Sequence, residues 1–211
     1  MSRLLLLFCF LPLVVFSQTP AKRMLEHADI AKWKSIESSK ISGDGRWVGY
    51  VVKPLEGDGE LRLYDGQSDK TLSVPRAENL NFSQDSRFLA FIIKPFRDST
   101  MNMRRRKVKR DDLPKDTLGV YDLRTMKLSK YAGVKSYQMP EKWSGWLAYL
   151  REPAKALPKD TSKFVWKKEN EENGSRLVLL ELGANQERLI GYVKSYQLAR
   201  DKARIAWYTT G

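Results

Sequence analysis

The 211 residues include 38 lysines and arginines against 25 aspartates and glutamates, which gives a formal net charge of +13, and the only cysteine is Cys9. One cysteine excludes an internal disulfide framework and a CxxC metal site. Such a positive charge is compatible with nucleic acid or an anionic surface as a partner, but the order of motifs along the chain favours another function.

Residues 1–17 predict a secretory signal peptide. Arg3 precedes an apolar run from Leu4 to Phe16, and Ser17 then leads into a polar stretch, which is the pattern of such signals. The run is shorter than the roughly 20 residues of a membrane-spanning helix. We therefore expect cleavage after Ser17, export to the periplasm or beyond, and no stable membrane span; an uncleaved signal anchor is the alternative. Because Cys9 lies in the signal, no cysteine nucleophile remains in the mature chain.

Residues 18–37 predict a short helical segment that precedes the main domain. Pro20 stands near its start, and apolar residues follow at partial helical spacing, namely Met24, Leu25, Ala28, Ala31 and Ile36. We expect this apolar side to pack, together with Trp33, against the domain that follows. The only histidine, His27, has no nucleophile near it in the sequence and is expected to be a surface residue.

A repeated turn and strand occupy residues 38–211. The clearest copies are Ile41–Tyr50 and Phe82–Phe91, which end at the same offset in Lys53-Pro54 and Lys94-Pro95; a weaker copy covers Trp143–Tyr149, and a further one begins at Asp201. The turn acids Asp44, Asp85 and Asp201 are explained by Asx hydrogen bonds without catalytic chemistry.

A second strand signal that ends in an acid follows each of the first three copies, at Leu61–Asp65, Leu118–Asp122 and Leu177–Glu181. The segment Val134–Gln138 recurs with the same five residues as Val193–Gln197. About four strands in roughly 40 residues is the size of a propeller blade. The sequence thus predicts an all-β fold, an incomplete β-propeller of about three four-stranded blades and the start of a fourth.

Two units contain extra residues between their second and third strand signals, at 96–116 and 154–175. We expect both to be long loops on one face of the propeller. The first contains the basic run Arg104–Arg110, and such a run is usually a solvated segment. Binding of nucleic acid through this run is the least favoured alternative, because it conflicts with export and no aromatic residues for base stacking are interleaved with the charges.

No GxSxG elbow, phosphate-binding GxxxxGK[ST] loop or HExxH motif occurs in the sequence. The sequence therefore predicts no catalytic, cofactor-binding or metal-binding residue and no cofactor.

Several of these features together resemble one family. They are the signal peptide, the Trp33-x-x-Ile36 start, the Ser-x-Asp-Gly/Ser-Arg turns at 42–50 and 83–91, and the run Arg104–Leu123. This combination resembles the N-terminal propeller of secreted bacterial serine peptidases of the prolyl oligopeptidase family, over essentially the whole mature chain.

The resemblance implies a two-part enzyme in which a propeller covers a C-terminal α/β-hydrolase domain that carries a Ser-Asp-His triad and cleaves oligopeptides. No residue of this chain matches the triad motif, so no catalysis is expected from the chain alone. The implied partners are the remaining blades and, through the missing hydrolase domain, a peptide substrate. The alternative is a stand-alone exported propeller that binds a polypeptide or a glycan.

Overall fold

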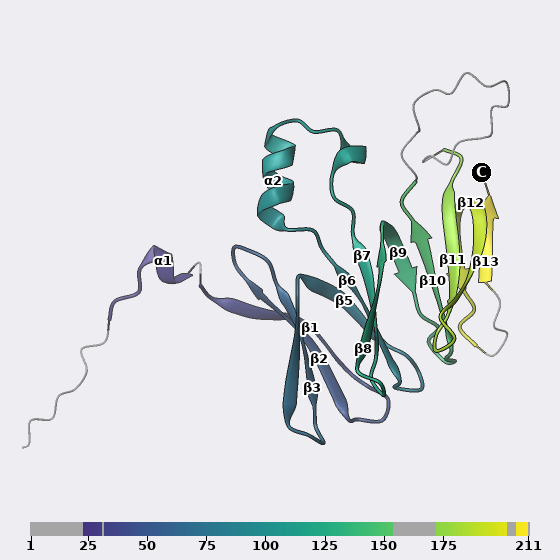
Figure 1. Cartoon of the computed structure of the whole chain (residues 1–211). Helices are drawn as coiled ribbons and strands as arrows, with labels where there is room; N and C mark the ends of the chain where they lie inside the picture. The colour runs from purple at the N-terminus through teal and green to yellow at the C-terminus, as the bar shows by residue number, and fades with distance from the viewer. Residues whose placement is uncertain (1–22, 31, 154–171, 202–205, 211) are drawn as a thin grey trace, which may run out of the picture.

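The computed structural model describes residues 23–30, 32–153, 172–201 and 206–210. The described chain forms three antiparallel sheets that stand side by side like the blades of a fan (Figure 1). The first two sheets have four strands each, in the orders β1-β2-β3-β4 and β5-β6-β7-β8. Consecutive strands are neighbours throughout, which is the meander expected of propeller blades.

The strands of the first two sheets match the repeated segments of the sequence. The first sheet consists of β1 (Lys34–Ile41), β2 (Trp47–Pro54), β3 (Glu60–Asp65) and β4 (Lys70–Pro75). The second consists of β5 (Ala77–Phe82), β6 (Phe88–Ile93), β7 (Thr117–Asp122) and β8 (Lys127–Ala132).

The third sheet has five strands in the order β13-β12-β11-β10-β9. They are β9 (Val134–Gln138), β10 (Trp146–Arg151), β11 (Ser175–Glu181), β12 (Gln186–Leu198) and β13 (Ala206–Thr210). The long β12 belongs to two repeats, because its first half pairs with β11 and its second half, from Val193 onward, pairs with β13. The second half contains the recurring segment Val193–Gln197, so β13 and this half-strand begin a fourth blade. The predicted incomplete propeller is confirmed, and the sheets do not close into a ring.

The start of each of the last three repeats has the same backbone device. In each case a residue with positive φ stands at the junction. It is Arg76 (61°) before β5, Gly133 (71°) before β9 and Tyr192 (57°) at the bend of β12. A buried small or β-branched residue follows in each case, namely Ala77, Val134 and Val193. The left-handed residue turns the chain from the last strand of one blade into the first strand of the next.

The core lies between the blades. In β6 all six residues are buried, whereas β2 and β3 alternate between more and less buried positions. A sheet covered on both faces has continuous apolar strands, and a sheet covered on one face has alternating ones. Blade 1 is therefore covered on one face only, which leaves Tyr50, Arg62 and Tyr64 half-exposed on the other.

The predicted helical segment at 18–37 is largely wrong where the structure describes it. Helix α1 covers only His27–Ile30, and Lys34 already begins β1. The cause is pairing with β2, since Lys34 to Ile41 lie in register with Pro54 to Val48, and a short isolated helix is marginal in water. Residues 1–22, and with them the predicted signal peptide, lie outside the described residues.

The predicted packing of this segment is also wrong. Met24, Leu25 and Trp33 are 85%, 74% and 57% exposed. The reason is that four residues make only one helical turn, which has too little apolar surface to dock against the first blade. His27 is exposed, as expected.

The insert at 96–116 is not a loop throughout. It contains α2 (Arg97–Arg105) and the short 3-10 helix η1 (Arg110–Asp112). An acidic residue in the first turn of α2 and arginines in its last turn suit the helix dipole, which explains the order that the loop prediction missed. The charged residues of the basic run are exposed, as expected. The second insert falls between β10 and β11, the predicted position, and most of it (154–171) lies outside the described residues.

Candidate binding pocket between the first two blades

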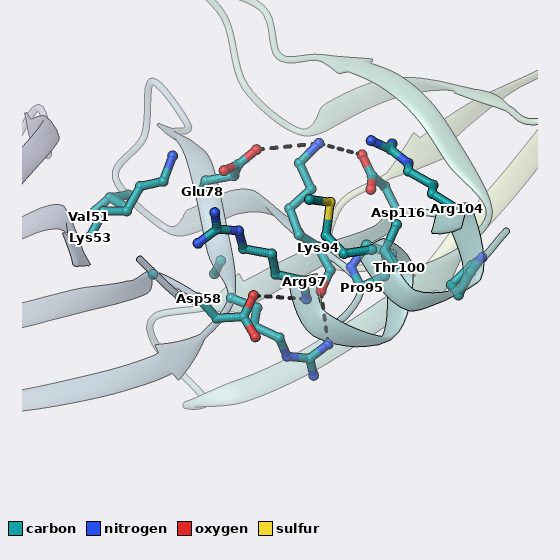
Figure 2. A pocket seen from close by; sticks show the side chains of 16 residues that line it. Val51, Lys53, Asp58, Glu78, Lys94, Pro95, Arg97, Thr100, Arg104 and Asp116 are labelled. Carbon is teal, nitrogen blue, oxygen red and sulfur yellow. Dashed lines mark hydrogen bonds and ion pairs between the residues drawn. The ribbon is translucent and has the colours of Figure 1, made fainter. Parts of the chain in front are cut away.

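A pocket of about 410 Å³ lies between blade 1 and blade 2, with α2 as one of its walls (Figure 2). It is formed by the β2–β3 hairpin, the beginning of β5, the end of β6 and the insert that follows β6. Its charged side chains include five cations and three carboxylates, an excess of two positive charges: Lys53, Arg76, Lys94, Arg97 and Arg104 against Asp58, Glu78 and Asp116.

Lys94 is the best-neutralised cation of the pocket. Its Nζ lies 2.7 Å from Asp116 and 3.3 Å from Glu78, and both pairs are drawn as dashed lines in Figure 2. Burial works to lower the pKa of Lys94, but the hydrogen bonds and negative charges of Asp116 and Glu78 outweigh it, so the pKa is raised. Lys94 is therefore charged across the physiological range and fixes both carboxylates in place.

Arg76 lines the pocket from the left-handed position before β5. Its Nη1 donates a 2.8 Å hydrogen bond to the backbone oxygen of Lys94, and its guanidinium stacks 3.9 Å from the centre of the Phe96 ring. The Nε of Arg76 is buried and has no hydrogen-bond partner among the residues described. The side chain is thus held by packing while part of its hydrogen-bonding capacity is unused.

Arg97 is the first residue of α2 and contributes a cation without a carboxylate of its own. Its backbone N–H donates to Asp58 at 3.1 Å, but within the described chain its guanidinium has no hydrogen bond or ion pair. In Figure 2 the side chains of Arg97 and Lys53 extend toward Glu78 from two sides. Lys53 has one partner outside the pocket, Glu37, at 3.4 Å. Within the described chain, Glu78 is ion-paired only with Lys94.

The opposite end of the same two blades contains structural ion pairs. Arg46 donates to Asp65 at 2.8 and 2.9 Å, and Arg87 donates to Asp122 at 3.1 Å in the next blade. The hydrogen bond from Arg46 lowers the pKa of Asp65 well below its usual range. A second hollow of about 670 Å³ lies here, and two of the arginines that line it, Arg46 and Arg87, are paired with Asp65 and Asp122.

The turn acids have the role that the sequence predicted. Asp44 accepts a hydrogen bond from the N–H of Arg46 at 3.1 Å, and Asp85 accepts one from the N–H of Arg87 at 3.3 Å. These are Asx turns, which explain both acids structurally. The turn around Asp201 lies partly outside the described residues.

The pocket residues were not predicted as a site. In the sequence, Lys53 and Lys94 stand out only as strand ends at the same offset of two repeats. This shared offset could have indicated that the two lysines lie close together, because equivalent strand ends of neighbouring blades lie at the same end of a propeller. The contribution of Arg97 could not be found from sequence, because it depends on the insert folding back as a helix.

The described residues contain neither a metal-binding cluster nor a membrane-spanning helix. They contain no group of three or more histidine, cysteine, aspartate or glutamate side chains that could hold a metal ion. None of the helices described is long and apolar enough to cross a membrane. No residue was predicted to be catalytic or cofactor-binding, and these observations do not test that expectation.

No protein-family model and no curated protein matches this sequence. Solved structures do match. Prolyl oligopeptidase B from Galerina marginata, bound to a 25mer macrocyclization substrate, is 14% identical with a TM-score of 0.50, over 83% of this chain and 26% of that chain. The β-propeller domain of the Trilobed protease from Pyrococcus furiosus is 13% identical with a TM-score of 0.49, and the match covers 81% of this chain and 47% of that chain. An acylaminoacyl peptidase from Pyrococcus horikoshii is 10% identical with a TM-score of 0.47, and the match covers 80% of this chain and 26% of that chain.

The likeness to prolyl oligopeptidase B, at a TM-score of 0.50, is a likeness of fold, and the meandering sheets described above are those of an incomplete β-propeller. The chain spans between about a quarter and a half of the length of these matched proteins.

Proposed function

We propose that this chain is the propeller part of an exported serine peptidase of the prolyl oligopeptidase type, in which it supports or gates a C-terminal α/β-hydrolase domain. The observation that carries the proposal is the likeness to prolyl oligopeptidase B, which extends over 83% of this chain but only 26% of the larger protein. The predicted signal peptide supports export. On this proposal, peptide-bond hydrolysis belongs to the whole enzyme, and the chain alone hydrolyses nothing.

The two inserts support the gating role. Both lie between the second and third strands of their blades, so they leave the propeller at the same end. The first contains α2, which stands at that end of the first two blades (Figure 1) and lines the pocket between them. Segments placed this way can narrow the path of a large substrate toward a domain that covers that end.

The decisive experiment is to read the gene downstream of codon 211 and to express the continuous product. We expect further blades and a GxSxG elbow, and hydrolysis of short peptides by the long product but not by the 211-residue chain. An authentic stop codon with no hydrolase sequence after it overturns the proposal. Deletion of residues 98–112 in the long product then tests gating, and unchanged selectivity for peptide size would argue against it.

The second candidate is a stand-alone exported propeller that binds a polypeptide or a glycan. The observation in its favour is the pocket between blades 1 and 2, which has an excess of positive charge. All of its lining residues belong to this chain, so it does not need a hydrolase domain to be formed. This candidate predicts an authentic stop codon and ligand binding by the chain itself.

A further inference from the structure

We propose that the pocket beneath α2 binds an organic carboxylate, such as the C-terminal end of a short peptide. The pocket lies wholly within blades 1 and 2 and their insert. The proposal therefore does not depend on a hydrolase domain, and the two can fail separately.

The charges of the pocket favour an anion. Glu78 and Asp116 are both engaged by Lys94, and Asp58 accepts the backbone N–H of Arg97. The guanidinium of Arg97 has no acceptor within the described residues. A guanidinium that faces a partly enclosed pocket gains most from a carboxylate, which it can bind through two parallel hydrogen bonds.

The repeat itself does not require these cations. The backbone N–H of Lys94 donates to the oxygen of Arg76, and at the next junction the N–H of Glu152 donates to the oxygen of Gly133. The positions of Arg76 and Lys94 are thus occupied by glycine and glutamate between blades 2 and 3. Since the same junction folds with an uncharged and an acidic residue, the two cations are a property of this pocket and not of the fold.

Arg76 is also an unusual residue for its backbone. Its φ of 61° lies in the left-handed region, which glycine adopts freely and side-chain-bearing residues do so less readily. Glycine fills this position at Gly133. An arginine at this position is consistent with a role for its side chain in the pocket.

The remaining lining favours an organic acid over a bare inorganic ion. Apolar or small side chains line the same space, namely Val51, Ala77, Pro95, Met101 and Pro114. They give the group attached to the carboxylate a surface to contact, whereas phosphate would use only the charges. The volume of about 410 Å³ lies in the usual range of small-molecule sites.

The test is calorimetric titration of the full chain with N-acetyl-Ala-Leu as the free acid, with its C-terminal amide, and with inorganic phosphate. We expect the acid to bind about tenfold or more tightly than the amide, because a charge-assisted hydrogen bond contributes roughly that factor. Phosphate is expected to bind more weakly than the acid. Equal binding of acid and amide, or phosphate binding as tightly as the acid, overturns the proposal.

Two substitutions on the same helix make the matched comparison. Arg97→Gln should weaken binding of the acid about tenfold, since it removes a lining guanidinium that has no hydrogen bond or ion pair within the described residues. Arg105→Gln removes an exposed charge of α2 that does not line the pocket, and it should leave the affinity unchanged. Both residues are exposed, so both variants should fold, which thermal melting verifies. Equal effects of the two substitutions would show that general positive charge attracts the acid, and would overturn the assignment to the pocket.

Discussion

The ring of Phe91 lies directly against Gly119, its register partner on the neighbouring strand of blade 2. A Cβ atom at Gly119 would overlap the ring, and Phe91 itself is fully buried. The absence of a side chain at Gly119 therefore makes room for the phenylalanine ring of Phe91 between blades 1 and 2.

Gly119→Ala should destabilise the chain by about 1–3 kcal/mol, the usual cost of adding a methyl group to a filled core. Urea unfolding followed by tryptophan fluorescence measures the effect. Gly191→Ala is the matched control, because a Cβ there meets nothing within 4 Å. Equal stabilities of the two variants would contradict the packing argument.

Ser42 and Ser83 have equivalent hydrogen bonds in successive blades. Each hydroxyl donates to an aspartate two residues later, at 2.5 Å, and accepts the N–H of the aromatic residue that begins the next strand, at 2.9 Å. We expect Ser42→Ala and Ser83→Ala to lose about 1–3 kcal/mol each, since both leave a buried N–H without its partner.

Ser39→Ala is the control for these two changes, because Ser39 is exposed on β1 and has no side-chain hydrogen bond in the described chain. Its unfolding midpoint should match that of the parent. If removal of Ser42 or Ser83 costs no more than removal of Ser39, the turns owe their shape to the backbone alone.

The repeat was predictable because its residues have strong local conformational preferences for turns and strands. The turn Ser-x-Asp-x-Arg and the apolar strand after it gave the positions of β2 and β6 correctly. The sequence failed at 34–37, where Ile36 fitted a partial helical spacing but pairing of β1 with β2 decided the structure. Register with a strand more than ten residues away is not visible in local periodicity.

The pocket was less predictable than the fold. Its residues come from two blades and an insert, and none belongs to a recognisable motif. Arg76 is instructive, because glycine at the equivalent Gly133 signals a left-handed residue and arginine does not. Sequence alone therefore gave no indication that the side chain of Arg76 lines a pocket.

Alkaline pH should destabilise the chain through Tyr149. Burial raises the pKa of Tyr149 to about 12, above the usual value of about 10. A group with a raised pKa in the folded state contributes its full stability below its unfolded pKa and loses it as the pH rises. Stability should thus fall between about pH 10 and 12, with a slope of about 1.4 kcal/mol per pH unit from this group.

The comparison of Tyr149→Phe with Tyr208→Phe tests this assignment. Tyr149→Phe should reduce the slope of unfolding free energy against pH in this window, whereas Tyr208, which is 42% exposed, should not affect it. Tyr137 and Tyr196 also have pKa values raised by burial, so part of the slope should remain. An unchanged slope in Tyr149→Phe would refute its contribution.

Acidic pH should destabilise the folded chain through protonation of Asp65. Its pKa is lowered first by the hydrogen bond from Arg46 and further by those from Gln67 and Ser68. A group with a lowered pKa stabilises the folded state above its unfolded pKa of about 3.9, and this contribution is lost as the pH falls through the folded value. Asp65→Asn should therefore lower the melting temperature at pH 7 and flatten its decline below pH 4.

The control for Asp65 is Asp111→Asn, a change at an exposed carboxylate of η1. It should leave both the melting temperature at pH 7 and the decline in acid unchanged. A decline in Asp65→Asn as steep as in the parent would assign acid sensitivity to other carboxylates, with Asp122, whose pKa is also lowered, the next to test.

The left-handed position between blades gives the last prediction. Gly133 has a φ of 71°, and a Cβ there would meet nothing within 4 Å, so any penalty of substitution is conformational. Gly133→Ala should cost about 1 kcal/mol, while Gly133→Asn should cost less, because asparagine visits the left-handed region more readily than alanine. Chemical unfolding of the two variants measures the difference. If the alanine variant proves as stable as the asparagine variant, the backbone at this junction can relax to negative φ. The positive φ of Arg76 would then no longer count as a reason to assign its side chain a role in the pocket.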